Sequence, residues 1–116
     1  MPYSGGPMTE AMYYVLLALT NPNHGYQLMN AIEHVSRKRV QMGPGTLYGI
    51  LTRLQKDGLI VVIDDDGRRK TYIVTPDGRE ALLEEYRRLI NMVEDGELLR
   101  EELLRENLPK EGFQNE

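Results

Sequence analysis

The sequence predicts a mainly helical α+β fold in which several helices accompany a single two-stranded β-hairpin. Apolar residues recur at helical spacing through the first half of the chain, which indicates amphipathic helices. One unbroken aliphatic run, Leu59-Ile60-Val61-Val62-Ile63, departs from that spacing and is followed by a turn and a second short run, as expected of a hairpin. The 116 residues suit one domain, or one small domain with an appended element.

The first two helices are separated by Asn21-Pro22, because proline disfavours the helical conformation of the residue before it. The first helix follows Thr9, a suitable N-cap, and runs to about Thr20. Its apolar positions are Ala11, Met12, Val15, Leu16 and Leu19. The second helix begins near Asn23 or His24 and ends at about Val35. The apolar residues expected near one of its faces are Tyr26, Met29, Ile32 and Val35.

The third helix opens at Gly45 or Thr46, after a turn that is rich in glycine and proline. Gly58 is placed to end it as the C′ residue, because glycine accepts the left-handed backbone conformation found there. The expected buried stripe consists of Leu47, Ile50, Leu51 and Leu54. The polar residues expected to point elsewhere include Thr46, Tyr48, Thr52, Arg53 and Lys56.

The hairpin is expected to pair residues 59–63 with residues 71–74 around a turn at Asp64-Asp65-Asp66-Gly67. Its tip carries both signs of charge, since Arg68-Arg69-Lys70 directly follow the three aspartates.

A last, long helix is expected from about Pro76 to Glu106, with Thr75 as its N-cap. Apolar residues along it alternate in steps of four and three, the pattern of a coiled-coil seam. The seam consists of Leu82, Tyr86, Leu89, Val93, Leu99 and Leu103. Gly96 also falls on the seam, where it marks either a close contact between helices or a break. The chain thus divides into a first domain over 1–75, a helix over 76–107 and a frayed tail over 108–116.

Charge is distributed unevenly along the chain, whose net charge is −4. Residues 1–36 carry −2, residues 37–79 carry +4 and residues 80–116 carry −6. A basic middle followed by an acidic tail indicates that these regions face different partners, although clustering by chance is the alternative.

Composition and motifs exclude several kinds of site. The absence of Cys excludes a disulfide scaffold, a Cys nucleophile and a thiolate metal site. The longest apolar run has nine residues, too few to span a bilayer, and the first residues lack the features of a secretion signal, so we expect a cytoplasmic protein. Gly43-Pro44-Gly45 lacks the Lys-Ser/Thr of a nucleotide-binding loop, and His24 and His34 have no suitably spaced third ligand. We therefore expect no metal, no cofactor and no enzymatic activity.

Three helices, a hairpin and a long helix form the element order of a winged helix-turn-helix. In that fold the third helix enters the major groove of double-stranded DNA, and the hairpin, or wing, lies near the phosphates. The first turn of a helix favours a phosphate through its free N–H groups, which makes Thr46 and Tyr48 candidate contacts. Partial packing against the second helix is the alternative for Tyr48. The full set of candidate DNA-binding residues is Thr46, Tyr48, Thr52, Arg53, Lys56, Arg68, Arg69 and Lys70.

The long helix needs a partner for its apolar seam, and a second copy of the chain would supply one. A twofold dimer would also present two recognition helices to successive major grooves of a palindromic site. The dimerisation residues expected on this reasoning are the seam residues Leu82, Tyr86, Leu89, Val93, Leu99 and Leu103.

Three segments together resemble the PadR family of transcriptional regulators: HGYQLM at residues 24–29, GPGTLYGILTRLQKDGLI at residues 43–60 and DGRRKTYIVTPDGREAL at residues 66–82. The resemblance spans about residues 8 to 106 and implies a winged-helix DNA-binding domain with a single C-terminal dimerisation helix. It also implies a repressor that a small, often aromatic, molecule releases from DNA. In addition, it implies that Thr46 and Tyr48 contact the DNA backbone. The residues that we expect to line an effector pocket are Met12, Tyr13, Tyr14, Met92 and Val93.

The Asp64-Asp65-Asp66 run departs from a purely basic wing, which leaves open how deeply the wing engages DNA. An alternative function is therefore a winged-helix module that recruits a protein partner through its acidic last helix and does not bind DNA.

Overall fold

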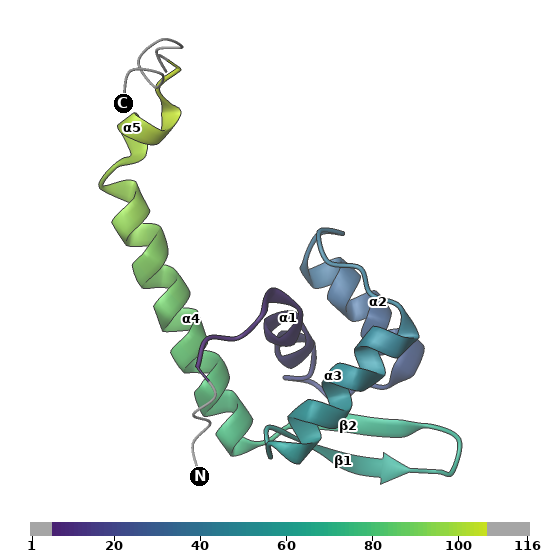
Figure 1. Cartoon of the computed structure of the whole chain (residues 1–116). Coiled ribbons are helices and arrows are strands. Elements are labelled where there is room, and N and C mark those ends of the chain that lie inside the picture. Colours follow the sequence, from purple (N-terminus) through teal and green to yellow (C-terminus); the bar gives the residue numbers. More distant parts are fainter. Residues whose placement is uncertain (1–5, 107–116) are drawn as a thin grey trace. The chain divides into compact units, whose positions relative to one another are not determined.

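The computed structural model describes residues 6–106 and has the expected mainly helical fold with one antiparallel hairpin (Figure 1). The tail expected to fray, 108–116, lies outside the described residues. The chain divides into two compact units, Met1–Tyr86 and Arg87–Glu116. The first unit includes the beginning of the last long helix as well as the 1–75 region. The elements are α1 (Glu10–Ala18), α2 (Gly25–Val35), α3 (Pro44–Lys56), β1 (Ile60–Asp65), β2 (Lys70–Val74), α4 (Pro76–Glu97) and α5 (Arg100–Leu104).

Local signals fix the helix ends that the sequence predicts. The hydroxyl of Thr9 accepts a hydrogen bond from the N–H of Met12 at 3.1 Å, which caps α1. The hydroxyl of Thr75 likewise accepts from the N–H of Gly78 at 3.0 Å at the start of α4. Gly58 follows α3 with φ of +78°, the left-handed conformation expected of a C′ glycine.

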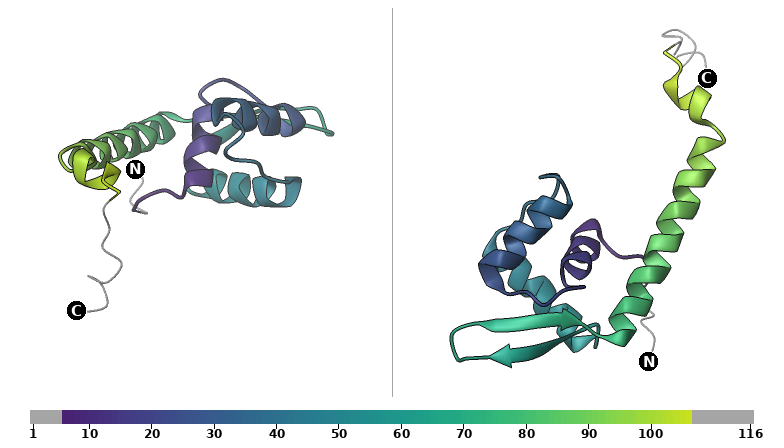
Figure 2. Two further views of the ribbon diagram at one scale, coloured as in Figure 1. Left: turned by 90° about the horizontal axis from the view of Figure 1, so that it is seen from above. Right: turned by 180° about the vertical axis from the view of Figure 1, so that it is seen from behind.

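The core of the first unit lies where α1, α2 and α3 meet the hairpin and the start of α4. Figure 2, in its view from above, shows α1 lying against both α2 and α3. The fully buried side chains of this core are those of Val15, Leu16, Leu19, Leu28, Ile32, Leu47, Leu51, Leu54, Leu59 and Ile60.

The predicted apolar face of α2 is wrong at two positions. Leu28 and Ile32, which are one turn apart, are buried, whereas Tyr26 is 79% exposed and Val35 is 45% exposed. The core selects the Leu28–Ile32 side because α2 must face α1 and α3 at once, and Tyr26 lies on the first turn, away from that contact.

The hairpin is longer than predicted and is bent. β1 continues through Asp64 to Asp65, so these two aspartates belong to the strand rather than to the turn, and Lys70 begins β2 opposite Asp65. The register shifts between Val62 and Asp64, which makes Ile63 the extra residue of a β-bulge. The wing is tied to the loop between α1 and α2 by two backbone hydrogen bonds between Asn23 and Tyr72, at 3.1 and 2.9 Å.

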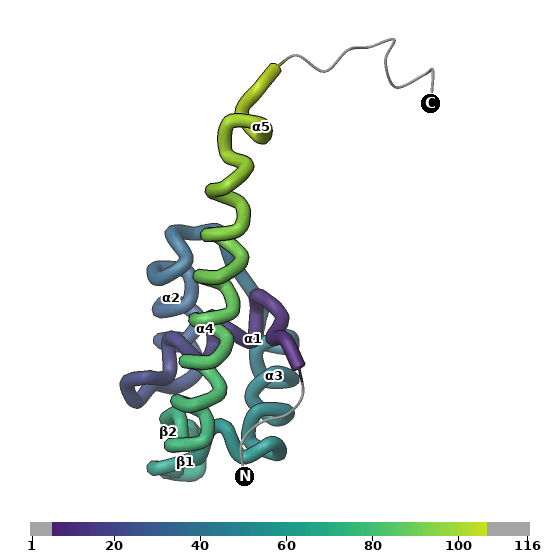
Figure 3. Tube along the Cα trace, turned by 90° about the vertical axis from the view of Figure 1, so that its left-hand side faces the viewer, coloured from purple at the N-terminus to yellow at the C-terminus, as the bar shows by residue number. Residues whose placement is uncertain are grey.

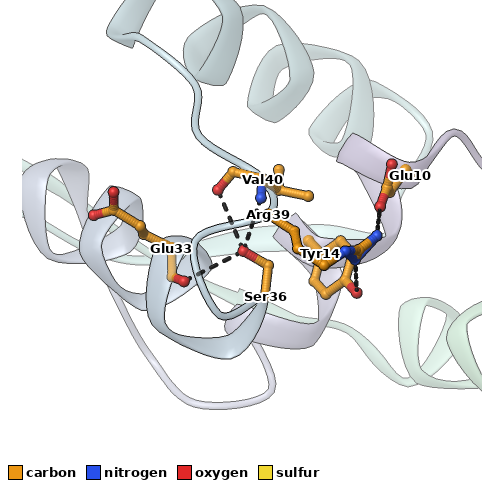
Figure 4. A network of polar contacts seen from close by, with 6 residues as sticks. All are labelled: Glu10, Tyr14, Glu33, Ser36, Arg39 and Val40. Carbon is orange, nitrogen blue, oxygen red and sulfur yellow. Dashed lines mark hydrogen bonds and ion pairs between the residues drawn. The ribbon is translucent and has the colours of Figure 1, made fainter.

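A buried serine organises the chain between α2 and α3. The hydroxyl of Ser36, a residue only 2% exposed, accepts from the N–H of Val40 at 3.0 Å and lies 3.3 Å from the carbonyl oxygens of Glu33 and Val40 (Figure 4). Next to it, Arg39 forms an ion pair with Glu10 on α1 and approaches the hydroxyl of Tyr14 at 3.4 Å. These contacts hold the connection to α3 against α1.

The last helix is shorter than expected. α4 ends at Glu97, and the N–H of Leu99 bonds to the carbonyl of Gly96 at 3.0 Å before the short helix α5 (Figure 3). The expected continuous helix to Glu106 is therefore wrong, and Gly96 lies next to the break. Glycine is the weakest helix former apart from proline, which favours a helix end near it.

Candidate nucleic-acid interface

All of the residues predicted to bind DNA are exposed in the structure. They lie on two elements of the first unit, Thr46 to Lys56 on α3 and Arg68 to Lys70 on the wing. In Figure 1, α3 descends from its first turn to the base of the hairpin, and the hairpin extends back toward the side on which α3 begins. The first turn of α3 and the tip of the wing thus face the same side of this unit, while the last turn of α3 lies near the base of the wing.

The N-terminus of α3 is open to a ligand. Its N-cap is Gly43, which has no side chain to cap the helix, and Pro44 occupies the first turn. The first N–H groups of a helix have no partner within it, and together with the helix dipole they favour an anion. Tyr48, which is 46% exposed, follows one turn later. The geometry of this helix end is therefore suitable for the phosphate contact that the sequence predicts.

The outward face of α3 is partly engaged in contacts of its own. The hydroxyl of Thr52 donates to the carbonyl of Tyr48 at 2.9 Å. The guanidinium of Arg53 pairs with Asp57 at 3.2 Å, one turn further along the helix. A DNA contact by Arg53 must therefore compete with this ion pair, which is an exposed pair of the kind that contributes only about 0–1 kcal/mol.

The wing tip is folded by its own aspartates. One carboxylate oxygen of Asp66 accepts from the N–H groups of Arg68 and Arg69 at 3.0 and 2.9 Å, and Asp65 accepts from the N–H of Gly67 at 2.9 Å. The hydrogen bonds from the two arginine N–H groups hold the pKa of Asp66 below its ordinary value of 3.8. Two of the three aspartates thus cap the turn that carries the arginines, a role that the sequence alone did not indicate.

Tyr26 is a candidate DNA-contacting residue that we did not predict from the sequence. It lies in the first turn of α2 and is the most exposed tyrosine among those in the described residues. The start of α2 also adjoins α3, because a Cβ at Gly25 would lie 3.3 Å from the hydroxyl of Tyr48. From the sequence we placed Tyr26 on the buried face and so did not predict its exposure. The spacing of Leu28 and Ile32, one turn apart, is the signal that indicates the buried face correctly.

Burial raises the pKa of Tyr72 above its ordinary value of 10, and the neighbouring phenol of Tyr48 and carboxylate of Asp65 raise it further. Tyr72 is 5% exposed and belongs to β2, so this side chain joins the wing to the core.

A separate cleft of about 340 Å³ opens between α1 and the first part of α4. Its lining residues are Tyr13, Leu17, Thr20, Arg79, Leu82, Leu83 and Tyr86. Burial, followed by the nearby phenol of Tyr14, raises the pKa of Tyr13 above 10. Among the residues predicted for an effector pocket, Tyr13 lines this cleft, whereas Tyr14 has its ring beneath Arg39, with the guanidinium carbon 5.9 Å from the ring centre. Met12 packs against the core, and Met92 and Val93 lie in the second unit, where they are exposed.

The predicted seam on the last helix is displaced by one residue over part of α4. Leu82 is buried in the core of its own unit, so it is not available to a partner as predicted, and Leu89 is half-buried. Four exposed apolar residues of α4 instead follow steps of three and four, at Leu83, Tyr86, Ile90 and Val93, and Met92 is exposed outside this stripe. Leu99 and Leu103 are exposed but follow the break after Glu97.

Other kinds of site have no support in the part of the chain that the structure describes. Within residues 6–106, no group of three or more His, Asp or Glu residues is placed to hold a metal ion. No helix in this range has the length and apolar content needed to cross a membrane.

An exposed third helix beside a hairpin that carries Arg68, Arg69 and Lys70 at its tip is the arrangement of winged-helix DNA-binding proteins. The model of the transcriptional regulator PadR-like family matches residues 15–84, more than half of the chain. The chain belongs to this family of DNA-binding transcriptional regulators, which are not enzymes.

Known relatives and solved structures agree with this membership. The transcriptional regulator Rv3488 of Mycobacterium tuberculosis is 43% identical over 76 residues, which cover 62% of this chain and 67% of the relative. A PadR family regulator from Eggerthella lenta has a TM-score of 0.60 at 28% identity, over 84% of this chain and 80% of that one. Bordetella bronchiseptica BpsR, whose structure addresses regulation of DNA binding by 6-hydroxynicotinic acid, is similar in fold, with a TM-score of 0.53 at 21% identity over 95% of this chain and 70% of that one. This chain spans only 21% and 35% of the length of two other curated relatives.

Proposed function

We propose that this chain is a dimeric, sequence-specific repressor of a palindromic operator. The observation that carries the proposal is the shared orientation of two exposed features, the uncapped start of α3 and the wing tip that Asp66 folds. In this arrangement α3 enters the major groove, while Arg68 and Arg69 contact phosphates beside it. A DNA partner would place the protein in the cytoplasm.

Dimerisation would give the operator its twofold symmetry. The exposed stripe of Leu83, Tyr86, Ile90 and Val93 on α4 supports a helix-to-helix contact with a second copy. Two recognition helices about 34 Å apart would then reach successive major grooves, and occupancy of the site would block transcription.

We also propose a small aromatic acid as the effector that releases DNA. The cleft beside Tyr13 offers the rings of Tyr13 and Tyr86 to an aromatic group and the guanidinium of Arg79 to a carboxylate. Its volume of about 340 Å³ is at the small end of the range for ligand sites. The fold of BpsR, whose DNA binding is regulated by 6-hydroxynicotinic acid, is similar, which favours this chemical class.

The experiment that tests DNA binding uses labelled DNA from upstream of the protein's own gene, titrated by fluorescence anisotropy across a range of salt concentrations. Arg68→Ala with Arg69→Ala should weaken binding to all sequences. The slope of log affinity against log salt should fall by about 2, because each phosphate contact contributes about 0.9. Arg100→Ala with Arg105→Ala removes the same charge from the first residue and the C-cap of α5 and serves as the matched control.

The outcome also separates the alternative function. Unchanged affinity in the wing variant would remove the wing from the interface. If the unsubstituted protein binds no DNA at low salt, the chain is better explained as a module that recruits a protein through its acidic last helix.

A further inference from the structure

The start of α2 lies beside Tyr48, one turn into α3, and is tied to the wing through Asn23. Gly25 begins α2 with φ of +33°, a conformation that residues with side chains rarely adopt. A Cβ built on Gly25 would lie 3.3 Å from the hydroxyl oxygen of Tyr48 on α3, closer than most such contacts. The missing side chain of Gly25 therefore leaves the space in which this hydroxyl lies.

The same segment of chain is joined to the wing. Asn23, two residues before Gly25, exchanges both backbone hydrogen bonds with Tyr72 on β2. The carboxamide oxygen of Asn23 also accepts from the N–H of His24 at 2.9 Å, which orders the approach to α2. Tyr48 thus lies against Gly25, and Gly25 lies two residues from Asn23, which is hydrogen-bonded to the wing.

We infer that Tyr48 is a positioning residue, whose hydroxyl against Gly25 sets the distance between α2 and the recognition helix and so aligns α3 with the wing. This role rests on the proposed DNA-binding function and extends it. It differs from the phosphate contact that the sequence suggested for Tyr48, because the hydroxyl acts within the protein.

The two roles make opposite predictions for a double substitution. If the hydroxyl sets the spacing, Gly25→Ala forces it away from α2, and Tyr48→Phe removes the atom that is displaced. The double variant should then bind DNA better than Gly25→Ala alone. If Tyr48 instead donates to a phosphate, the losses caused by the two substitutions should add.

The experiment is a double-mutant cycle read in two ways, by unfolding in urea and by anisotropy with labelled upstream DNA and a scrambled fragment of equal length. We expect Gly25→Ala to weaken binding to the upstream DNA about fivefold more than binding to the scrambled DNA, a usual size of coupling for residues in contact. Tyr48→Phe in that background should restore affinity to within about twofold of the unsubstituted protein.

Gly58→Ala is the matched control, because Gly58 also has a positive φ, of +78°, but a Cβ there would meet no atom within 4 Å. It should lower stability through backbone strain alone, and Tyr48→Phe should not correct it. Additive losses in the Gly25 cycle, or coupling in urea without a change in the preference for upstream DNA, would overturn the positioning role. Failure of the unsubstituted protein to bind DNA would instead refute the proposed function, and the positioning role with it.

Discussion

Gly78 shows how one residue without a side chain joins α4 to the rest of its unit. A Cβ at this position would lie 2.0 Å from the carbonyl oxygen of Leu59 and 2.5 Å from a methyl carbon of Val74. Both neighbours are held, Leu59 by its buried side chain and Val74 by its place in β2. Only glycine allows α4 to begin this close to the hairpin.

Gly78→Ala should therefore destabilise the protein by about 3 kcal/mol, the upper part of the usual range for overpacking a rigid site. The free energy of unfolding in urea measures the effect. Gly49→Ala provides the control, since Gly49 lies within α3 and a Cβ there would meet nothing within 4 Å. It should leave stability unchanged or raise it by up to about 1 kcal/mol. Equal behaviour of the two variants would contradict the close approach of α4.

The lowered pKa of Asp66 predicts how the tip of the wing responds to pH. Its pKa in the folded protein is lowered by hydrogen bonds from the N–H groups of Arg68 and Arg69, so the folded tip favours the charged carboxylate. The carboxylate of Asp66 therefore stabilises the folded wing tip above pH 3.8, the ordinary pKa of this group. This stabilisation is lost as the pH falls through the lowered pKa. The amide protons of Arg68 and Arg69 should lose protection below that pH, when their exchange rates are compared with those of an unstructured peptide at the same pH. The same loss of protection should occur near neutral pH in Asp66→Ala, whereas Asp64→Ala, beyond the tip, should show little change. Hydrogen exchange followed by NMR measures both.

At the scale of elements, α4 has two different apolar faces. The buried face, at Gly78, Ala81 and Leu82, packs on the core of the first unit. The exposed face, at Leu83, Tyr86, Ile90 and Val93, has no covering within the chain as described. This second face is the surface that we assign to dimerisation.

Ile90→Asp with Val93→Asp should convert a dimer into a monomer, because each charge would be buried without a partner in a helix-to-helix interface. Light scattering gives the mass, and circular dichroism should show that the helices are retained. Asp95→Arg alters an exposed residue on the opposite side of the same helix and should remain dimeric. A dimeric double-aspartate variant would place the interface on other residues.

At the scale of the whole molecule, an effector must couple the cleft beside Tyr13 to DNA affinity. The coupling is reciprocal, so a ligand that weakens DNA binding must itself bind less tightly to the DNA complex. An aromatic carboxylate such as benzoate or a hydroxylated derivative is the appropriate probe, with the corresponding amide to test the role of charge.

We expect the acid to lower operator affinity about tenfold and the amide to have a smaller effect, because the guanidinium of Arg79 can form an ion pair with the carboxylate but not with the neutral amide. Arg79→Leu should remove the difference between acid and amide while leaving DNA binding without ligand intact. Anisotropy titrations with and without the probe measure this coupling. An equal response of Arg79→Leu and the unsubstituted protein would remove Arg79 from the effector site.

Local sequence signals predicted the order of the elements as far as α4 and most of their ends. Thr9, Thr75 and Gly58 act through hydrogen bonds and backbone conformations that involve only a few neighbouring residues, so these signals are legible without the rest of the fold. The hairpin and the start of the helix that follows it were predicted for the same reason, whereas the candidate residues on α3 were predicted from the order of the elements and the resemblance to the PadR family.

The side of each element that faces inward, and the contacts between elements, depended on how the elements pack together. The burial of Leu28 in place of Tyr26 and the displaced stripe on α4 depend on where neighbouring helices lie, because several apolar faces of one helix fit the same periodicity. The bulge at Ile63 and the turn folded by Asp66 depend on the pairing of two strands. Contacts such as Gly25 with Tyr48 join residues far apart in the sequence, and no local pattern records them.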